Sequence, residues 1–381
     1  MNDHIAASMS LLVVFGMAGC GDATTAVRVN LSDSNPVYAA YRSDGAWTRP
    51  ERVSTTEFSF EVASSYEFVA VCQDALGRTD IEVLRASPSD GDQTIEPDLS
   101  NGSCRNTEFT GEFGRVQGHV DSRGYVWVGN FSKLTTDATL SYDFGAAAGS
   151  RDAVFIGLPT DHTLPRAAIQ RDLLVPANVT TVLDPVDLSL APSTVLLTAI
   201  ADSAIDESIS VSSDLRTQNH SHVSISAGSG GKFLAIGPEL LLPTDLEVVT
   251  VTARTPTTLR AGVARVESDD VKVGLLPLVQ STFESANGVV DVAWDGRISA
   301  DIGTVVRLET PETLVHVVTT STLSVGTSQL SVDLAPTAPG WDPSWQPAWG
   351  DDLSVVDRTF IVFRQSDAGT TYSSITTPAA K

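Results

Sequence analysis

Basic side chains are scarce in this chain. Of its 381 residues, 24 are lysine or arginine and 47 are aspartate or glutamate, which gives a formal net charge of −23 at pH 7. Lysine occurs only at Lys133, Lys232, Lys272 and Lys381. Because nucleic-acid grooves and anionic lipid surfaces both attract clustered positive charge, we expect no nucleic-acid partner and no electrostatic docking onto lipid.

Cysteine is also rare, occurring only at Cys20, Cys72 and Cys104. Cys72 and Cys104 have no cysteine or histidine nearby at the spacing of a zinc site, which argues against metal binding. Two cysteines in an exported chain usually pair, and closing a loop of about 30 residues is worth about 3–4 kcal/mol. We predict a structural disulfide between Cys72 and Cys104, with a reactive thiol or a metal ligand as the alternative.

Sustained helical periods are missing, and the apolar runs are short. Apolar and polar residues instead alternate over brief stretches, as at Val27, Val29 and Leu31, with Gly, Pro, Asn and Asp between them. This pattern is typical of strands joined by turns. We therefore predict an all-β fold of tandem antiparallel β-sandwiches, Ig-like or transthyretin-like, because no helices lie between the strands.

An uncharged apolar segment covers residues 5–19 and leads into Met17-Ala18-Gly19-Cys20. It is shorter than the roughly 20 residues needed to cross a bilayer, and it fits the apolar region of a cleaved export signal. Its end resembles the lipobox of bacterial lipoproteins. The resemblance implies cleavage after residue 19 and lipidation of Cys20, with palmitate-type chains as a membrane anchor. An ordinary cleaved signal and an N-terminal anchor helix are the alternatives.

The length of the mature chain suggests several domains. After a signal peptide over 1–19, we predict β-sandwich units over 20–106, 107–192, 193–277 and 278–381. In the second unit, a strand containing Gly118, a hairpin over 125–128, an aromatic strand over 140–144 and an apolar strand over 153–156 follow one another. This order, covering about 112–160, resembles transthyretin-like modules related to carboxypeptidase regulatory domains, which implies a non-catalytic sandwich.

Half of the tryptophans, Trp341, Trp345 and Trp349, lie in one short segment interrupted by Pro343 and Pro347. Three indoles on a proline-stiffened loop could form a stacking platform for sugar rings. Large apolar side chains on a long connection more often pack inward. We therefore favour burial of these indoles, with ligand binding as the alternative.

Catalytic motifs are not apparent. His220 and His222 place two imidazoles on one strand face, but a zinc site needs further ligands, and Asp214 and Asn219 give thin support. No nucleophile elbow is present, and the remaining histidines are scattered. We assign no catalytic residue, no metal and no cofactor.

Together these features predict an exported lipoprotein, lipid-anchored to the bacterial cell envelope, with the outer membrane as the default location. The expected role is non-catalytic: structural, adhesive, or binding of a glycan or an envelope protein. One alternative is an envelope hydrolase with a carbohydrate-binding tryptophan cluster. Another is a periplasmic assembly factor that offers a sheet edge to a partner strand.

Overall fold

The computed structural model describes residues 24–31, 36–73, 77–95, 112–136, 138–158, 163–219, 221–295, 303–324, 328–333, 338–366 and 369–378. Regular structure in these ranges is almost entirely β-strand, which confirms the expected all-β class. Their helices are the short α1 (Ser321–Ser324) and the 3-10 turns η1 (Pro88–Asp90), η2 (Pro238–Leu240), η3 (Pro343–Trp345) and η4 (Leu353–Val355). None of these described helices is long and apolar enough to cross a membrane.

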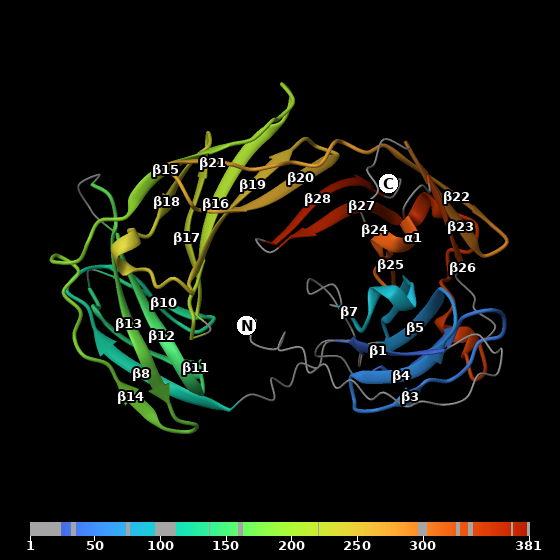
Figure 1. Ribbon diagram of the computed structural model, residues 1–381, viewed down its shortest axis with the longest axis horizontal. Helices are drawn as coiled ribbons and strands as arrows, with labels where there is room; N and C mark the ends of the chain where they lie inside the picture. The colour runs from blue at the N-terminus through green and yellow to red at the C-terminus, as the bar shows by residue number, and fades with distance from the viewer. Residues whose placement is uncertain are drawn as a thin grey trace, which may run out of the picture.

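One sheet of 11 strands dominates the molecule (Figure 1). In spatial order its strands are β17 (His222–Ser229), β16 (Ser208–Arg216), β19 (Leu246–Arg254), β20 (Thr258–Arg265), β28 (Gly369–Thr377), β27 (Asp357–Ser366), β24 (Gly303–Glu309), β25 (Thr313–Thr319), β6 (Thr79–Ala86), β5 (Tyr66–Gln73) and β2 (Tyr38–Arg42). All of its pairs are antiparallel except β25 with β6, which run parallel.

In the described ranges, five smaller sheets pack around it or form the second unit. Two have four strands: β3 (Glu51–Arg52), β4 (Glu57–Val62), β1 (Thr25–Leu31), β7 (Gln93–Ile95); and β10 (Phe131–Thr135), β9 (Gly124–Val128), β12 (Gly149–Gly157), β13 (Arg166–Val175). Three have three strands: β11 (Ser141–Ala147), β8 (Phe113–His119), β14 (Thr180–Val182); β18 (Lys232–Ala235), β15 (Val195–Ile200), β21 (Asp270–Lys272); and β22 (Ser281–Ala286), β23 (Val289–Trp294), β26 (Gln329–Asp333).

Alternation along the strands explains the layers, because successive side chains point to opposite faces of a sheet. Val249 and Val251 of β19 face the β18-β15-β21 sheet and share its core. Val306 and Leu308 of β24 lie on the same side of the large sheet and pack against the β22-β23-β26 sheet. On the opposite side, Phe68 of β5 packs against the β3-β4-β1-β7 sheet.

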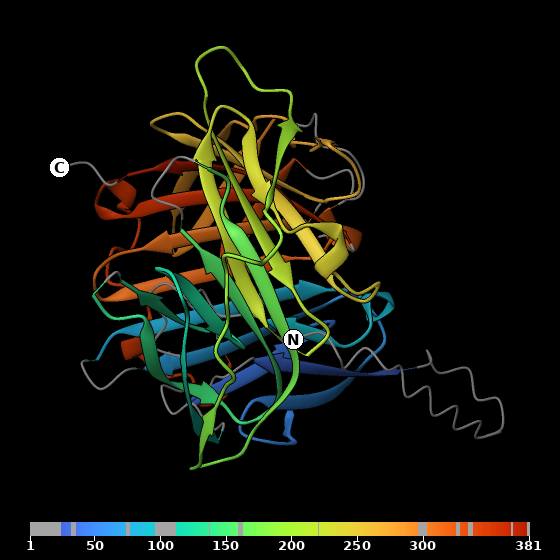
Figure 2. The ribbon, with the colours of Figure 1, turned by 90° about the vertical axis from the view of Figure 1, so that its left-hand side faces the viewer.

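The large sheet is curved, and β17 and β5, at or next to its two ends, lie on opposite sides of the molecule in Figure 1. The β18-β15-β21 and β22-β23-β26 sheets lie outside this curve, whereas the β8–β14 strands and the β3-β4-β1-β7 sheet lie at its two ends. Seen from the side, the strands of the second and third units stand one above the other (Figure 2). Where the β3-β4-β1-β7 sheet does not cover it, the other face of the large sheet lines the inside of the curve.

The large sheet runs across three of the four predicted units. Strands from 20–106, 193–277 and 278–381 all belong to it, and only 107–192 forms a separate pair of sheets. In that second unit, β8, β9, β11 and β12 overlap the four segments expected as strands. The domain boundaries and the transthyretin-like resemblance of this unit stay predictions.

Candidate functional site

The three indoles of the C-terminal segment pack against the core. Trp349 is 8% exposed, and Trp341 and Trp345 are partly buried. The planes of Trp341 and Trp345 cross at 90° with their centroids 5.4 Å apart, and the ring of Tyr38 lies 5.7 and 5.1 Å from them. A sugar platform needs coplanar ring faces that are open to solvent, whereas these rings meet edge to face or tilted. The geometry supports the structural interpretation of this segment.

The cysteines and histidines singled out from the sequence lie in different places. Cys72 is buried in β5, opposite Asp80 of β6, whereas Cys20, Cys104 and His220 lie outside the described residues. The Nε2 atom of His222 is 3.6 Å from Oδ1 of Asp214 on the neighbouring strand. Among the described residues, no group of three or more His, Cys, Asp or Glu side chains is arranged to hold a metal ion.

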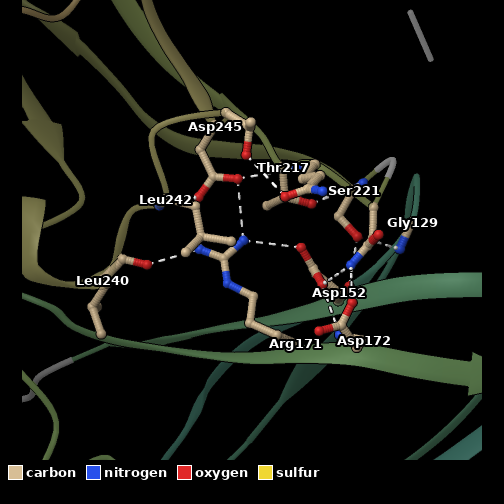
Figure 3. A network of polar contacts seen from close by, with 12 residues as sticks. Gly129, Asp152, Arg171, Asp172, Thr217, Ser221, Leu240, Leu242 and Asp245 are labelled. Atoms are coloured by element: carbon tan, nitrogen blue, oxygen red, sulfur yellow. Dashed lines mark hydrogen bonds and ion pairs between the residues drawn. The ribbon is translucent and has the colours of Figure 1, made fainter. Parts of the chain in front are cut away.

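A buried ionic network joins the second and third units, centred on Arg171 of β13 (Figure 3). Its Nη1 donates to Oδ2 of Asp152 at 2.9 Å, and its Nη2 donates to Oδ2 of Asp245 at 2.7 Å. The same Nη2 donates to the Leu240 carbonyl at 2.8 Å. Arg171 comes from the second unit, whereas Asp245 and Leu240 belong to the third, so this guanidinium joins β13 to the connection between β18 and β19.

A bulge in β13 positions this arginine. Arg171 and Asp172 together lie opposite Asp152, at the register shift between β12 and β13. Asp172 has a φ of 57°, a left-handed conformation that aspartate tolerates better than most residues. Its backbone N–H donates to Oδ1 of Asp152 at 3.0 Å. The bulge therefore aims Arg171 out of the sheet and supplies a further donor to Asp152.

The remaining contacts come from the connection between β16 and β17. The Nδ2 atom of Asn219 donates to Asp152 at 2.9 Å and to Asp172 at 2.8 Å. The Ser221 hydroxyl donates to the Asp152 carbonyl at 2.5 Å and accepts from the Gly129 N–H at 3.0 Å. Asn219 therefore adds a donor to the carboxylates of Asp152 and Asp172, and Ser221 fixes the backbone at Asp152 (Figure 3).

Burial and hydrogen bonding in this network shift the pKa values of Asp152 and Arg171. The carboxylates of Asp152 and Asp245 are completely buried, and the Arg171 side chain is 19% exposed. Burial opposes ionisation of Asp152, but the hydrogen bonds from Asn219, the Asp172 N–H, Thr217 and Arg171 outweigh it and hold its pKa below the usual value. The Arg171 pKa is raised by its bonds to Asp245 and Asp152, despite burial. Asp152 and Arg171 therefore stay charged at neutral pH.

An apolar cluster lies beside the network and completes the junction. Both faces of β12 are covered, since its inner side packs within the second unit and its outer side meets the third unit. The outer-side cluster comprises Val154, Ile156 and Ala167 from the second unit and Leu215, Val223, Ile225 and Ile236 from the third. A buried interface that combines apolar packing with satisfied charges favours a fixed relative position of the two units.

Two further ionic groups belong to the large sheet. Arg42, Glu67 and Arg85 lie in register on β2, β5 and β6 and line a surface hollow of about 380 Å³. One Glu67 oxygen accepts from Arg42 Nε at 2.8 Å and the other from Arg85 Nη2 at 3.1 Å. Where β25 and β6 pair in parallel, Nδ1 of His316 lies 2.7 Å from Oε2 of Glu82. Glu82 is 1% exposed. Both groups connect neighbouring strands.

The buried Arg171 network was missed by sequence reasoning. Its one signal is Asp152, an acidic residue directly before the apolar run at 153–156. Comparison with protein-family models gives no match, and comparison with curated proteins gives none either. The lipobox and transthyretin-like resemblances therefore stay predictions, and function must be argued from geometry.

Proposed function

We propose that this protein is a lipid-anchored protein of the bacterial cell envelope, attached through Cys20, with a non-catalytic structural, adhesive or ligand-binding role. The observation that carries the non-catalytic part is the Arg171 network. Its completely buried carboxylates are engaged in joining two units. Charged groups used in this way stabilise a rigid body and are not accessible to a substrate.

The continuous large sheet supports the same role. Its strands from three predicted units pair directly, so these units are connected by backbone hydrogen bonds as well as by side-chain packing. A rigid curved body of this kind is suited to presenting a surface at a fixed distance from a membrane. The hydrolase alternative has less support, because the indoles assigned to carbohydrate binding pack against one another.

Membrane attachment is tested by replacing Cys20 with alanine. We expect the Cys20→Ala chain to incorporate no palmitate and to leave the membrane fraction, or to remain unprocessed, because the sulfur that receives the lipid is gone. Metabolic palmitate labelling and membrane fractionation measure this. Met17→Leu, which keeps the motif, is the matched control and should label like the parent. Equal labelling and fractionation of Cys20→Ala would contradict the anchor.

The disulfide between Cys72 and Cys104 is part of this proposal, because an exported chain folds in an oxidising compartment. In unfolded, unreduced protein, neither cysteine should react with a thiol reagent, and both should react after reduction. Reduction should lower the free energy of unfolding by about 3 kcal/mol. Mass mapping of the labelled peptides checks the pairing. Labelling of both residues before reduction would remove it.

A further inference from the structure

The surface hollow lined by Arg42, Glu67 and Arg85 holds two guanidiniums in fixed positions. Glu67 accepts hydrogen bonds from both of them, and its side chain is 12% exposed. The Cζ atom of Arg42 also lies 4.7 Å from the centroid of the Trp47 ring. On the other side, Nη2 of Arg85 donates to the Ser331 carbonyl at 2.6 Å. Side chains that are already ordered lose little further freedom when a ligand binds.

Each guanidinium keeps one nitrogen that the surrounding protein does not use. Within the described ranges, Nη1 of Arg42 and Nη1 of Arg85 donate to no other residue. Two positive charges line the hollow against the one negative charge of Glu67. Arginine N–H groups of this kind bind phosphate oxygens. A hollow of about 380 Å³ also has room for a phosphate group together with its substituents.

An acidic side chain and an apolar side chain border the two arginines. Asp44 is exposed and lies between Ser43 and Gly45, which both line the hollow. Its carboxylate accepts from the Ser64 hydroxyl at 2.9 Å. Leu323 of α1 also lines the hollow. A ligand that matches this arrangement carries a phosphate for the arginines, a cationic group for the carboxylate and an apolar part beside them.

The hollow lies at the end of the first unit where the chain enters it. Strand β1 begins at Thr25, which pairs with Val62 at the end of β4. Residues 63–65 then lead into β5, and Ser65 lines the hollow. Cys20 precedes Thr25 by five positions, a length of chain that spans at most about 18 Å. Lipidation of Cys20 therefore brings the membrane surface to this end of the molecule.

The other charges around this end favour a headgroup of zero net charge. Glu61, Asp90 and Asp92 lie around it, and Arg28 of β1 is engaged in an ion pair of its own. With Asp44 and the net charge of −23, these acidic groups oppose docking onto an anionic membrane surface. A zwitterionic headgroup instead offers its phosphate to the arginines and its ammonium group to the neighbouring carboxylate.

We propose that this hollow binds a zwitterionic phospholipid headgroup that has a phosphate diester and a primary ammonium group. Arg42 and Arg85 bind the phosphate oxygens, Asp44 binds the ammonium group, and Leu323 contacts the glycerol end of the lipid. The inference rests on the proposed attachment through Cys20, because a tethered protein meets membrane lipid at a high effective concentration. This second contact fixes the orientation of the protein on the membrane.

The test titrates soluble dihexanoyl lipids into the full-length protein, extracted in a maltoside detergent, and follows binding by native mass spectrometry. Dihexanoyl phosphatidylethanolamine should bind saturably. It should bind about tenfold more tightly than dihexanoyl phosphatidylglycerol, which lacks the ammonium group, and than inorganic phosphate. Arg42→Gln should weaken this binding about tenfold or more, because a charged donor to the phosphate is lost. Asp44→Asn should abolish the preference for the ethanolamine headgroup over the glycerol headgroup.

Arg115→Gln is the matched control, since Arg115 also pairs with a carboxylate but is 60% exposed on β8 of the second unit. It should bind like the parent, and thermal melting of each variant verifies that it folds. The inference is overturned if phosphatidylethanolamine does not bind, or if phosphatidylglycerol or inorganic phosphate binds as tightly. It is also overturned if Asp44→Asn keeps the headgroup preference, or if a folded Arg42→Gln chain binds as well as Arg115→Gln.

Failure of the anchor and failure of the headgroup site are distinguishable. The soluble lipids reach the hollow in detergent whether or not Cys20 carries a lipid, so this titration does not depend on attachment. Palmitate labelling of Cys20→Ala tests the anchor by itself. Normal labelling of the parent without binding of phosphatidylethanolamine removes the headgroup site and leaves the anchor in place.

Discussion

Replacing Arg171 with leucine should lower the free energy of unfolding by about 3–5 kcal/mol. The variant leaves the completely buried carboxylates of Asp152 and Asp245 without the guanidinium that they share. Leucine fills part of the space but donates no hydrogen bond, so both charges face the cost of desolvation. The expected loss is the cost of leaving these charges unpaired, not the net stability that the ion pairs provide.

The measurement is guanidinium unfolding followed by tryptophan fluorescence, since Trp127 packs beside this junction. Arg115→Leu is the matched control, because Arg115 also contacts an aspartate, Asp143, at 2.7 Å, but its side chain is 60% exposed. Exposed ion pairs contribute little to stability, so this control should unfold like the parent. Equal effects of the two substitutions would show that the junction is not stabilised by the buried network.

A second comparison separates charge from packing. In the Arg171→Leu background, changing Asp152 and Asp245 to asparagine removes both unpaired charges and leaves one acceptor oxygen on each side chain. Part of the lost stability should then return, because neutral amides cost less to bury than carboxylates. If the triple variant is as unstable as Arg171→Leu alone, the loss comes from packing of the arginine stem.

Strand positions were largely predictable, because burial follows from period-two alternation. Val27, Val29 and Leu31 are expected on one face and are all buried against the same core. Partner choice was not predictable, since it depends on contacts that are distant in the sequence. Glu82 and His316 are 234 residues apart, yet their strands pair in parallel. Nothing in the local pattern of either strand specifies the other.

The candidate sites also differ in how far the sequence predicts them. Burial of Trp349 could be argued from composition and loop length, because large apolar side chains pack inward. The Arg171 network could not, because a charged residue in a strand is normally expected on the solvent face. The burial of Arg171 depends on a bulge at Asp172 and on acceptors from a unit whose position the sequence does not reveal. Networks of this kind become visible only when the units are assembled.

Replacing Glu247 with glutamine should make the protein more stable at alkaline pH but not at acidic pH. Glu247 is 6% exposed in β19, and its Oε1 accepts the Ile236 N–H at 2.7 Å. Burial raises the pKa of this carboxyl from 4.5 to about 7, and the Ile236 N–H opposes the shift. Folding therefore favours the protonated carboxyl, and the ionised form weakens the native state.

The sign of the effect follows from proton binding. Below pH 4.5 the carboxyl is protonated in both states, whereas between 4.5 and about 7 the folded state holds a proton that the unfolded chain has released. Stability contributed by this group therefore falls as the pH rises through that window. Above it both states are ionised, and the full penalty of about 3 kcal/mol applies. Glutamine keeps an acceptor for Ile236 and has no charge to bury.

The measurement is the free energy of unfolding of Glu247→Gln and of the parent from pH 4 to pH 9. The variant should exceed the parent by about 3 kcal/mol at pH 9, and this advantage should disappear near pH 4. Glu284→Gln, at an exposed glutamate in β22, is the control and should track the parent throughout. A difference between Glu247→Gln and the parent that is the same at every pH would mean that packing, and not ionisation, distinguishes glutamate from glutamine at this position.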